Sequence, residues 1–281
     1  MKFILAAPGN RPDDWPLMQK AAVEAEELGF WAFLLPDHFM GGRDFGGDST
    51  LDTWLAVSYL APLTDNIRLG SLVTPVTLRP PSILAKMVST LDVLSDGRTV
   101  LGIGAGSSQS EFEAYAQWDS SKVRVEKTVE GVELILRLWT EGTVDFQGKY
   151  FKAKGAVLEP KPRQKPHPPL IFGGMGPRML QVAGKYADIC LIPLADTDGV
   201  NAREEVIRGA ESRQRKGDIA FAGATEALPQ PWHDYDRDRY LERFELAEKL
   251  GCEYLIVPFP WKTYLESLED FAKNVMPPLK V

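Results

Sequence analysis

Short apolar runs alternate with longer amphipathic stretches along the whole chain. In the runs most consecutive positions are hydrophobic, which is typical of parallel strands buried on both faces. The runs occupy residues 3–8, 31–35, 67–76, 99–103, 170–172, 189–194, 219–223 and 254–258. Stretches with helical spacing lie between them, at residues 53–63, 82–94, 123–139, 178–186, 202–216, 239–250 and 263–275, and a first helix carries Leu17 to Leu28 and ends at Gly29.

Eight strand–helix units in succession predict an α/β fold, a (β/α)8 TIM barrel. One interruption follows the fourth unit. Residues 143–153 alternate like a small hairpin that turns at Gln147-Gly148, and a proline-rich connection covers residues 160–169. The stretch at 219–231 is short and irregular, so it is the weakest part of the pattern. No linker divides the chain, and we expect residues 1–281 to form a single domain with a small hairpin insertion.

Composition narrows the partners and the compartment. The net charge of −7 argues against binding to nucleic acid or to an anionic membrane surface. No segment approaches the ~18 uninterrupted apolar residues of a membrane span. Cys190 and Cys252 lie in or beside apolar runs, where we expect small buried residues in a reducing compartment. We therefore expect a soluble, cytoplasmic protein.

Candidate chemistry follows from the barrel, because active sites in this fold form at the carboxyl ends of the strands. The residues at those positions are Asn10, Asp37, His38, Phe39, residues 71–75, residues 104–107, residues 173–178, Pro193, Leu194 and residues 258–261.

The loop Gly173-Gly174-Met175-Gly176 comes between a strand and a helix. Glycines there let backbone N–H groups approach an anion, and the helix N-terminus adds partial positive charge. Arg178 could add a bidentate contact to a phosphate. A tight turn that requires positive φ would explain the same glycines, so phosphate binding and a turn both remain open.

A second glycine-rich stretch, Gly102-Gly104-Gly106, is not a dinucleotide fingerprint, because Ser107 stands where the third glycine is required. We expect these glycines to keep the floor of the site low enough for a flat ring.

Asp37 and His38 end the second strand, where they could orient a substrate or handle a proton. The alternative is an ion pair that ties a loop down. We expect His167 and His233 to be solvated surface residues. The three histidines show no metal-ligand spacing, so no metal site is expected.

Five stretches stand out: GSLVTPVTLRPPSILAKMVSTLDVLSDGRTVLGIGAG, EELGFWAFLLPDHF, EFEAY followed by Arg124, Glu130 and LRLW, then PPLIFGGMGPRMLQVAGKYAD and LEDFAKNVMPPL. Together they resemble one family, the luciferase-like monooxygenases. The resemblance runs from the first strand to the last helix and is weak only between residues 194 and 238. LDVLSDGR followed by LGIGAG is its most specific part.

The resemblance implies a flavin, or the deazaflavin coenzyme F-420, with its ring at the barrel mouth. It implies a non-prolyl cis peptide between Ser71 and Leu72 against that ring, and a phosphate on the loop of Gly174. His38 and Asp37 would lie near the reacting carbon as catalytic residues. Together, the candidate cofactor-binding residues are Ser71, Leu72, Val73, Gly104, Ala105, Gly106, Gly174, Met175, Gly176 and Arg178. Ser107 departs from the family, because some deazaflavin members have a glutamate there.

Three hypotheses follow. The favoured one is a coenzyme F-420-dependent oxidoreductase that transfers a hydride between the deazaflavin and a small organic substrate. The second is a monooxygenase that depends on reduced FMN and on a partner flavin reductase. The third is a barrel that binds the cofactor without catalysis. The resemblance also implies a homodimer, formed through the helices at 53–63 and 82–94.

Overall fold

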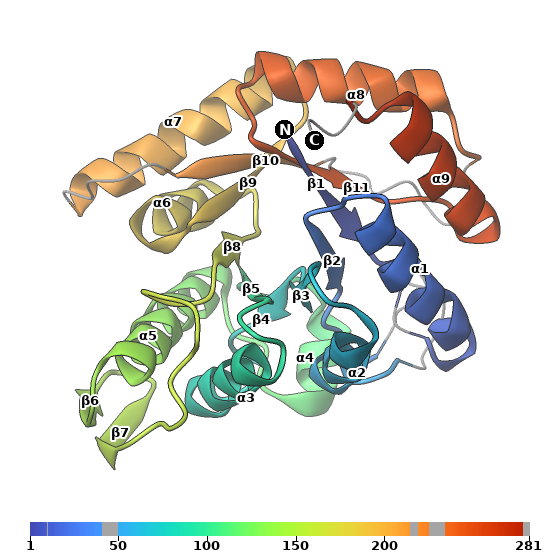
Figure 1. Cartoon of the computed structure of the whole chain (residues 1–281). Helices are drawn as coiled ribbons and strands as arrows, with labels where there is room; N and C mark the ends of the chain where they lie inside the picture. The colour runs from blue at the N-terminus through green and yellow to red at the C-terminus, as the bar shows by residue number, and fades with distance from the viewer. Residues whose placement is uncertain (10, 41–49, 214–218, 225–233, 278–281) are drawn as a thin grey trace.

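Eight parallel strands form a closed barrel with helices around it (Figure 1). A computed structural model describes residues 1–9, 11–40, 50–213, 219–224 and 234–277. The strands are β1 (Lys2–Ala6), β2 (Ala32–Leu35), β3 (Arg68–Ser71), β5 (Thr99–Gly104), β8 (Leu170–Phe172), β9 (Ile189–Pro193), β10 (Ala220–Ala224) and β11 (Tyr254–Val257). The barrel closes because β1 pairs with both β2 and β11, while β3 pairs with β5. The predicted TIM barrel is confirmed, including its weak seventh strand.

The helices of the barrel lie outside the strands, as Figure 1 shows. They are α1 (Trp15–Glu27), α2 (Thr53–Leu60), α3 (Pro81–Leu94), α5 (Ser121–Thr140), α6 (Pro177–Tyr186), α7 (Asp196–Ser212), α8 (Arg237–Lys249) and α9 (Tyr264–Asn274). Two helices differ most from the prediction. The helix α7 begins six residues before position 202, because its first turns are polar and hide the periodicity. A short helix, α4 (Gln109–Tyr115), was not predicted at all.

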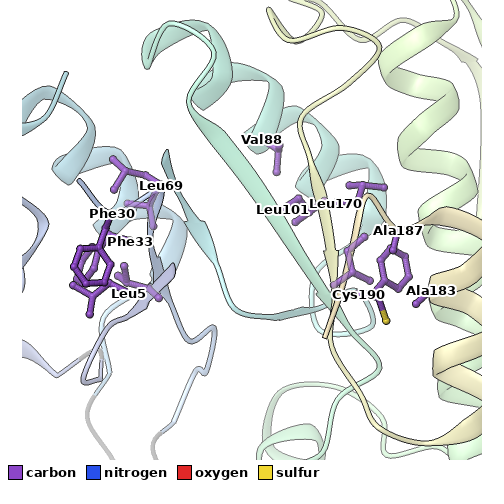
Figure 2. Packing of buried hydrophobic residues seen from close by; sticks show 14 of the residues in the cluster. Leu5, Phe30, Phe33, Leu69, Val88, Leu101, Leu170, Ala183, Ala187 and Cys190 are labelled. Carbon is purple, nitrogen blue, oxygen red and sulfur yellow. The ribbon is translucent and has the colours of Figure 1, made fainter. Parts of the chain in front are cut away.

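Two apolar layers hold the barrel together. Inside it, side chains such as Ile4, Leu34 and Ile256 from alternate strand positions pack against one another. The intervening positions point outward to the helices, and Figure 2 shows Leu101 and Leu170 of paired strands beside Val88 of α3. Burial of a leucine of this kind stabilises the fold by about 2 kcal/mol. Because each strand is covered on both faces, its sequence is apolar throughout.

The third unit carries the first correction. The predicted strand at 67–76 is divided into β3 and β4 (Thr74–Pro75), with a non-prolyl cis peptide at Leu72–Val73 and not at Ser71–Leu72. The shift by one residue follows from the hydrogen bonds. The amide of Leu72 still donates to Leu35 of β2 at 2.8 Å, whereas Thr74 already pairs with β5. The chain therefore changes direction between residues 72 and 74.

The predicted hairpin is present as β6 (Val144–Gln147) and β7 (Lys152–Ala156), but its tight turn at Gln147-Gly148 is wrong. Four residues, 148–151, connect the strands. The carboxylate of Glu130 on α5 accepts hydrogen bonds from the amides of Lys149 at 2.9 Å and Tyr150 at 2.8 Å, and from Phe151. A neighbouring helix thus supplies the acceptors that a tight turn would have provided itself.

Two smaller predictions are settled by burial. Cys190 and Cys252 are free and buried, as expected, and burial raises the pKa of the Cys190 thiol to about 12. His167 is not a solvated residue, because its ring is half-buried, stacks on Trp139 and bonds to the carbonyl of Pro168. His233 lies outside the described residues.

Within the described chain, no helix has the length and apolar character needed to cross a membrane.

Candidate active site

A cavity of about 840 Å³ opens at the carboxyl ends of β2, β4, β5 and β8. Most of the predicted cofactor residues line it: Leu72, Val73, Gly104, Ala105, Gly106, Gly174, Gly176 and Arg178. The fold therefore brings together loops that are up to about 140 residues apart in the chain, from Pro36 to Met179.

Two predicted cofactor residues do not line this cavity. Ser71 is buried beneath it, where its hydroxyl donates to the carbonyl of Gly102 at 3.3 Å. Met175 packs against the apolar interior of the barrel. Among the other candidates, Pro193, Leu194 and residues 258–261 do not line the cavity, and Asn10 lies outside the described residues.

His38 faces the cavity and is paired with a buried carboxylate. Its Nδ1 lies 3.0 Å from Oε2 of Glu111. Glu111 is in the first turn of α4 and also lines the cavity. The amide of Phe39 donates to the other oxygen of Glu111 at 2.5 Å. Burial raises the pKa of Glu111, but the hydrogen bonds from His38 and from the amides of Phe39 and Met40 outweigh it, so the pKa lies below its ordinary value. The folded structure therefore favours the ionised form of Glu111, whose Oε2 faces Nδ1 of His38.

Asp37 points away from the cavity into an ion pair. Its Oδ1 accepts from Nη2 of Arg79 at 2.8 Å, and its Oδ2 accepts from Nε of Arg79 at 3.0 Å. The hydroxyl of Thr74 lies 2.7 Å from the same Oδ2. This is the loop-tying ion pair that the sequence left open as an alternative for Asp37.

The two glycines flanking Met175 have different reasons to be glycine. Gly174 has a φ of +107°, which side chains other than that of glycine rarely adopt. Gly176 has an ordinary φ of −73°, and a Cβ placed on it would meet no atom of the described residues within 4 Å. The positive φ of the turn requires a glycine at position 174, whereas Gly176 leaves open space at the cavity wall. The turn and the anion site are both compatible with this loop.

Groups that could hold an anion surround that space. Gly176 is the N-cap of α6, and no side chain caps the amides of its first turn. Arg178 and Arg124 both line the cavity. Arg124 stacks on Trp118, with 3.7 Å from its guanidinium carbon to the ring centroid, and its buried Nε has no hydrogen-bond partner among the residues that the structure describes.

The family model of the luciferase-like monooxygenases matches residues 1–231. The chain belongs to this family. It thereby joins a family of flavin- or deazaflavin-dependent oxidoreductases and monooxygenases.

Solved structures share the luciferase-like barrel at low identity. A coenzyme F-420-dependent secondary alcohol dehydrogenase, in complex with an F-420–acetone adduct, is 20% identical with a TM-score of 0.85, covering 100% of this chain and 99% of that one. The monooxygenase RslO1 from Streptomyces bottropensis is 19% identical, with a TM-score of 0.80 and 98% of both chains covered. The coenzyme F-420-dependent tetrahydromethanopterin reductase from Methanopyrus kandleri is 20% identical, with a TM-score of 0.78 and 99% of both chains covered. At these identities the likeness shows the fold.

Sequence reasoning missed three residues of this luciferase-like site: Glu111, Arg124 and Arg79. Glu111 and Arg124 stood in or beside stretches that carried the family resemblance, but nothing in their spacing pointed to the cavity. Glu111 is 73 residues from His38 along the chain. Its one available signal was its place shortly after the glycine-rich end of β5.

Proposed function

We propose that the protein is a coenzyme F-420-dependent oxidoreductase that transfers a hydride between the deazaflavin and a small organic substrate. The observation that carries the proposal is the pairing of His38 with the buried, ionised Glu111 at the cavity wall. Hydride transfer to or from a carbonyl or an alcohol also requires a proton, and a histidine oriented by a carboxylate is suited to move it.

The residues of the cavity fit such a cofactor. Its volume lies in the range that holds drug-sized ligands, and its apolar walls suit a flat ring. At one side, the space beside Gly176, the uncapped amides of α6 and the unpartnered Nε of Arg124 suit a phosphate. We assign the phosphate end to Gly176, Arg178 and Arg124, and the ring to Leu72, Val73 and Gly104.

In this proposal the bound deazaflavin supplies the hydride acceptor or donor. Glu111 keeps the proton of His38 on Nδ1, and we assign to Nε2 the transfer of a proton from the substrate or back to it. The assignment of the proton to Nδ1 follows from the charge of Glu111 and not from an observed hydrogen. The apolar residues Pro36, Val73 and Pro75 exclude water from the reacting groups. Asp37, predicted as catalytic, serves in our proposal to position His38.

A monooxygenase that uses reduced FMN, supplied by a flavin reductase, is the second candidate. The same phosphate groups suit FMN, whose tail ends in a phosphate. A non-catalytic carrier is less well supported, because binding alone does not require a carboxylate–histidine pair at the cavity wall.

We also propose that the protein is located in the cytoplasm and forms a homodimer.

Titration of the purified protein with coenzyme F-420 and with FMN, followed by fluorescence quenching, tests the proposal. We expect tight binding of the deazaflavin and weaker binding of FMN. The His38→Ala variant is expected to keep this affinity and to lose turnover by at least about a hundredfold, the lower end of general acid–base catalysis. Preference for FMN would favour the monooxygenase, and failure of both ligands would contradict the proposed cofactor site.

The Gly176→Leu variant locates the ligand in the cavity. Since a Cβ at Gly176 meets nothing, we expect unchanged thermal stability but at least about tenfold weaker cofactor binding, as the side chain occupies the phosphate space. Gly142→Leu is the matched control, because Gly142 also has open space and does not line the cavity.

A further inference from the structure

Arg79 contacts both chain neighbours of His38. Its guanidinium makes a two-point hydrogen bond to Asp37, at 2.8 and 3.0 Å. It also lies over the ring of Phe39, with 4.7 Å between the guanidinium carbon and the ring centroid. The residue that precedes His38 and the residue that follows it are therefore held by one side chain.

The same guanidinium extends to the next helix. Its Nη2 also donates to Oδ2 of Asp52 at 2.9 Å, while Oδ1 of Asp52 accepts the amide of Leu55 and so caps α2. Arg79 itself precedes α3. It thus joins the end of β2, the start of α2 and the start of α3 next to His38, which lines the cavity.

These contacts depend on the planar shape of the Arg79 guanidinium as well as on its positive charge. Arg79 is 9% exposed and Asp37 is 2% exposed, so an unpaired charge at either position would be costly. A lysine carries the same charge, but it cannot form the planar two-point bond to Asp37 while also reaching Asp52 and covering a ring.

We propose that Arg79 is a positioning residue that sets the orientation of His38 toward the cavity and toward Glu111. It acts by holding Asp37 on one side of His38 and Phe39 on the other. The amide of Phe39 is itself bonded to Glu111, so a displacement of Phe39 would disturb both members of the pair. The consequence for turnover rests on the proposed function, whereas the consequence for His38 does not.

The test compares Arg79→Lys with Arg98→Lys. Arg98 is a matched control, because its guanidinium bonds to the carbonyls of Ala61 and Ile67 and to the hydroxyl of Thr64 near the opposite end of the barrel strands. Both variants lose a multidentate arginine, but only one of these arginines touches the neighbours of His38. Asp52→Asn, in which the amide can still cap α2, is the milder variant should Arg79→Lys not fold.

The first readout is the imidazole ¹⁵N NMR spectrum of the protein without cofactor. The chain has three histidines, so His38→Gln assigns the signals of His38 by their disappearance. We expect Arg79→Lys, and to a smaller extent Asp52→Asn, to shift and broaden the His38 signals toward those of a free histidine. Arg98→Lys is expected to leave the His38 signals unchanged, although it lowers thermal stability by an amount comparable to that of Arg79→Lys.

The second readout is kinetic. With coenzyme F-420, kcat of Arg79→Lys is expected to fall about tenfold while KM for the cofactor stays within about twofold, because orientation and not cofactor binding is affected. Unchanged His38 signals in a folded Arg79→Lys variant would overturn the positioning role, whatever the cofactor is. Altered signals without any F-420 turnover in the wild type would overturn the proposed function and leave the role of Arg79 standing.

Discussion

At the residue scale, the site depends on which side chains are ionised and on what holds them. Glu111 is 1% exposed and remains charged because His38 and two backbone amides donate to it. Asp37, next to His38 in the chain, is bonded to Arg79 instead and does not line the cavity. Two acidic residues close to one histidine therefore have different roles, set by their hydrogen bonds.

The charge of Glu111 predicts a pH-dependent contribution to stability. Its pKa in the folded protein lies below its ordinary value of 4.5, so the folded state favours the ionised form. That stability is fully present above pH 4.5 and is lost as the pH falls through the lower, folded-state value. We expect Glu111→Gln to lower the free energy of unfolding by about 2 kcal/mol at pH 7, and by progressively less below pH 4.5.

Urea unfolding of both proteins between pH 3 and 7 measures this difference. Glu113→Gln is the control, since Glu113 lies on the same helix and is exposed. A difference between wild type and Glu111→Gln that stays constant over the whole range would contradict the ionised, stabilised carboxylate.

At the element scale, α6 and α7 pack more closely than side chains would allow. A Cβ on Gly209 would lie 2.1 Å from the carbonyl oxygen of Gln181, and one on Gly184 would lie 2.0 Å from that of Val206. Two glycines on facing helices thus permit backbone contact. The packing matters for the site, because the N-terminus of α6 carries Gly176 and Arg178 to the cavity wall.

Gly209→Ala tests this packing. Alanine is about 1 kcal/mol more favourable than glycine within a helix, but the helices would have to move apart to admit it. We expect a net loss of about 1–3 kcal/mol in the free energy of unfolding, measured by chemical denaturation. Gly142→Ala, where a Cβ has open space, should change it by less than about 0.5 kcal/mol. Equal stability of the two variants would show that the helices adjust at no cost.

At the scale of the whole molecule, α2 and α3 belong to successive units on the outside of the barrel (Figure 1). Both helices expose apolar side chains. On α2, Leu55 and Tyr59 are four residues apart and share a face. On α3, Ile83 and Leu94 are 55% and 75% exposed. We propose that these exposed apolar residues belong to the surface of the predicted homodimer, which would bury them.

The double variant Leu55→Lys with Ile83→Lys is expected to be monomeric at micromolar concentration, where we expect the wild type to sediment as a dimer. Charges placed in the interface would repel across the twofold axis. Val200→Lys is the control, because Val200 on α7 is also exposed and lies outside the proposed surface. A wild type that sediments as a monomer, or a double variant that still dimerises, would contradict the proposed interface.

The sequence by itself determined the barrel, the family and most of the cavity wall. Strands that are apolar at consecutive positions must be covered on both faces, and eight of them leave few other folds. Residues such as Gly104, Gly174 and Arg178 were predictable because they lie at the end of a strand or in the loop and helix start that come after it. Their position relative to the strands is visible in the local sequence. In a TIM barrel the carboxyl ends of all strands meet at one end, so this position is enough to place them at the cavity.

The tertiary structure decided the contacts between residues far apart in the chain. The partner of His38 is 73 residues away, and Arg79 is 42 residues from Asp37. Such pairs leave no periodic or spaced signal, because hydrogen bonds act across space and are specified by the packing of whole elements. The same reason explains the position of the cis peptide and the turn held by Glu130, since each depends on a hydrogen bond to another element.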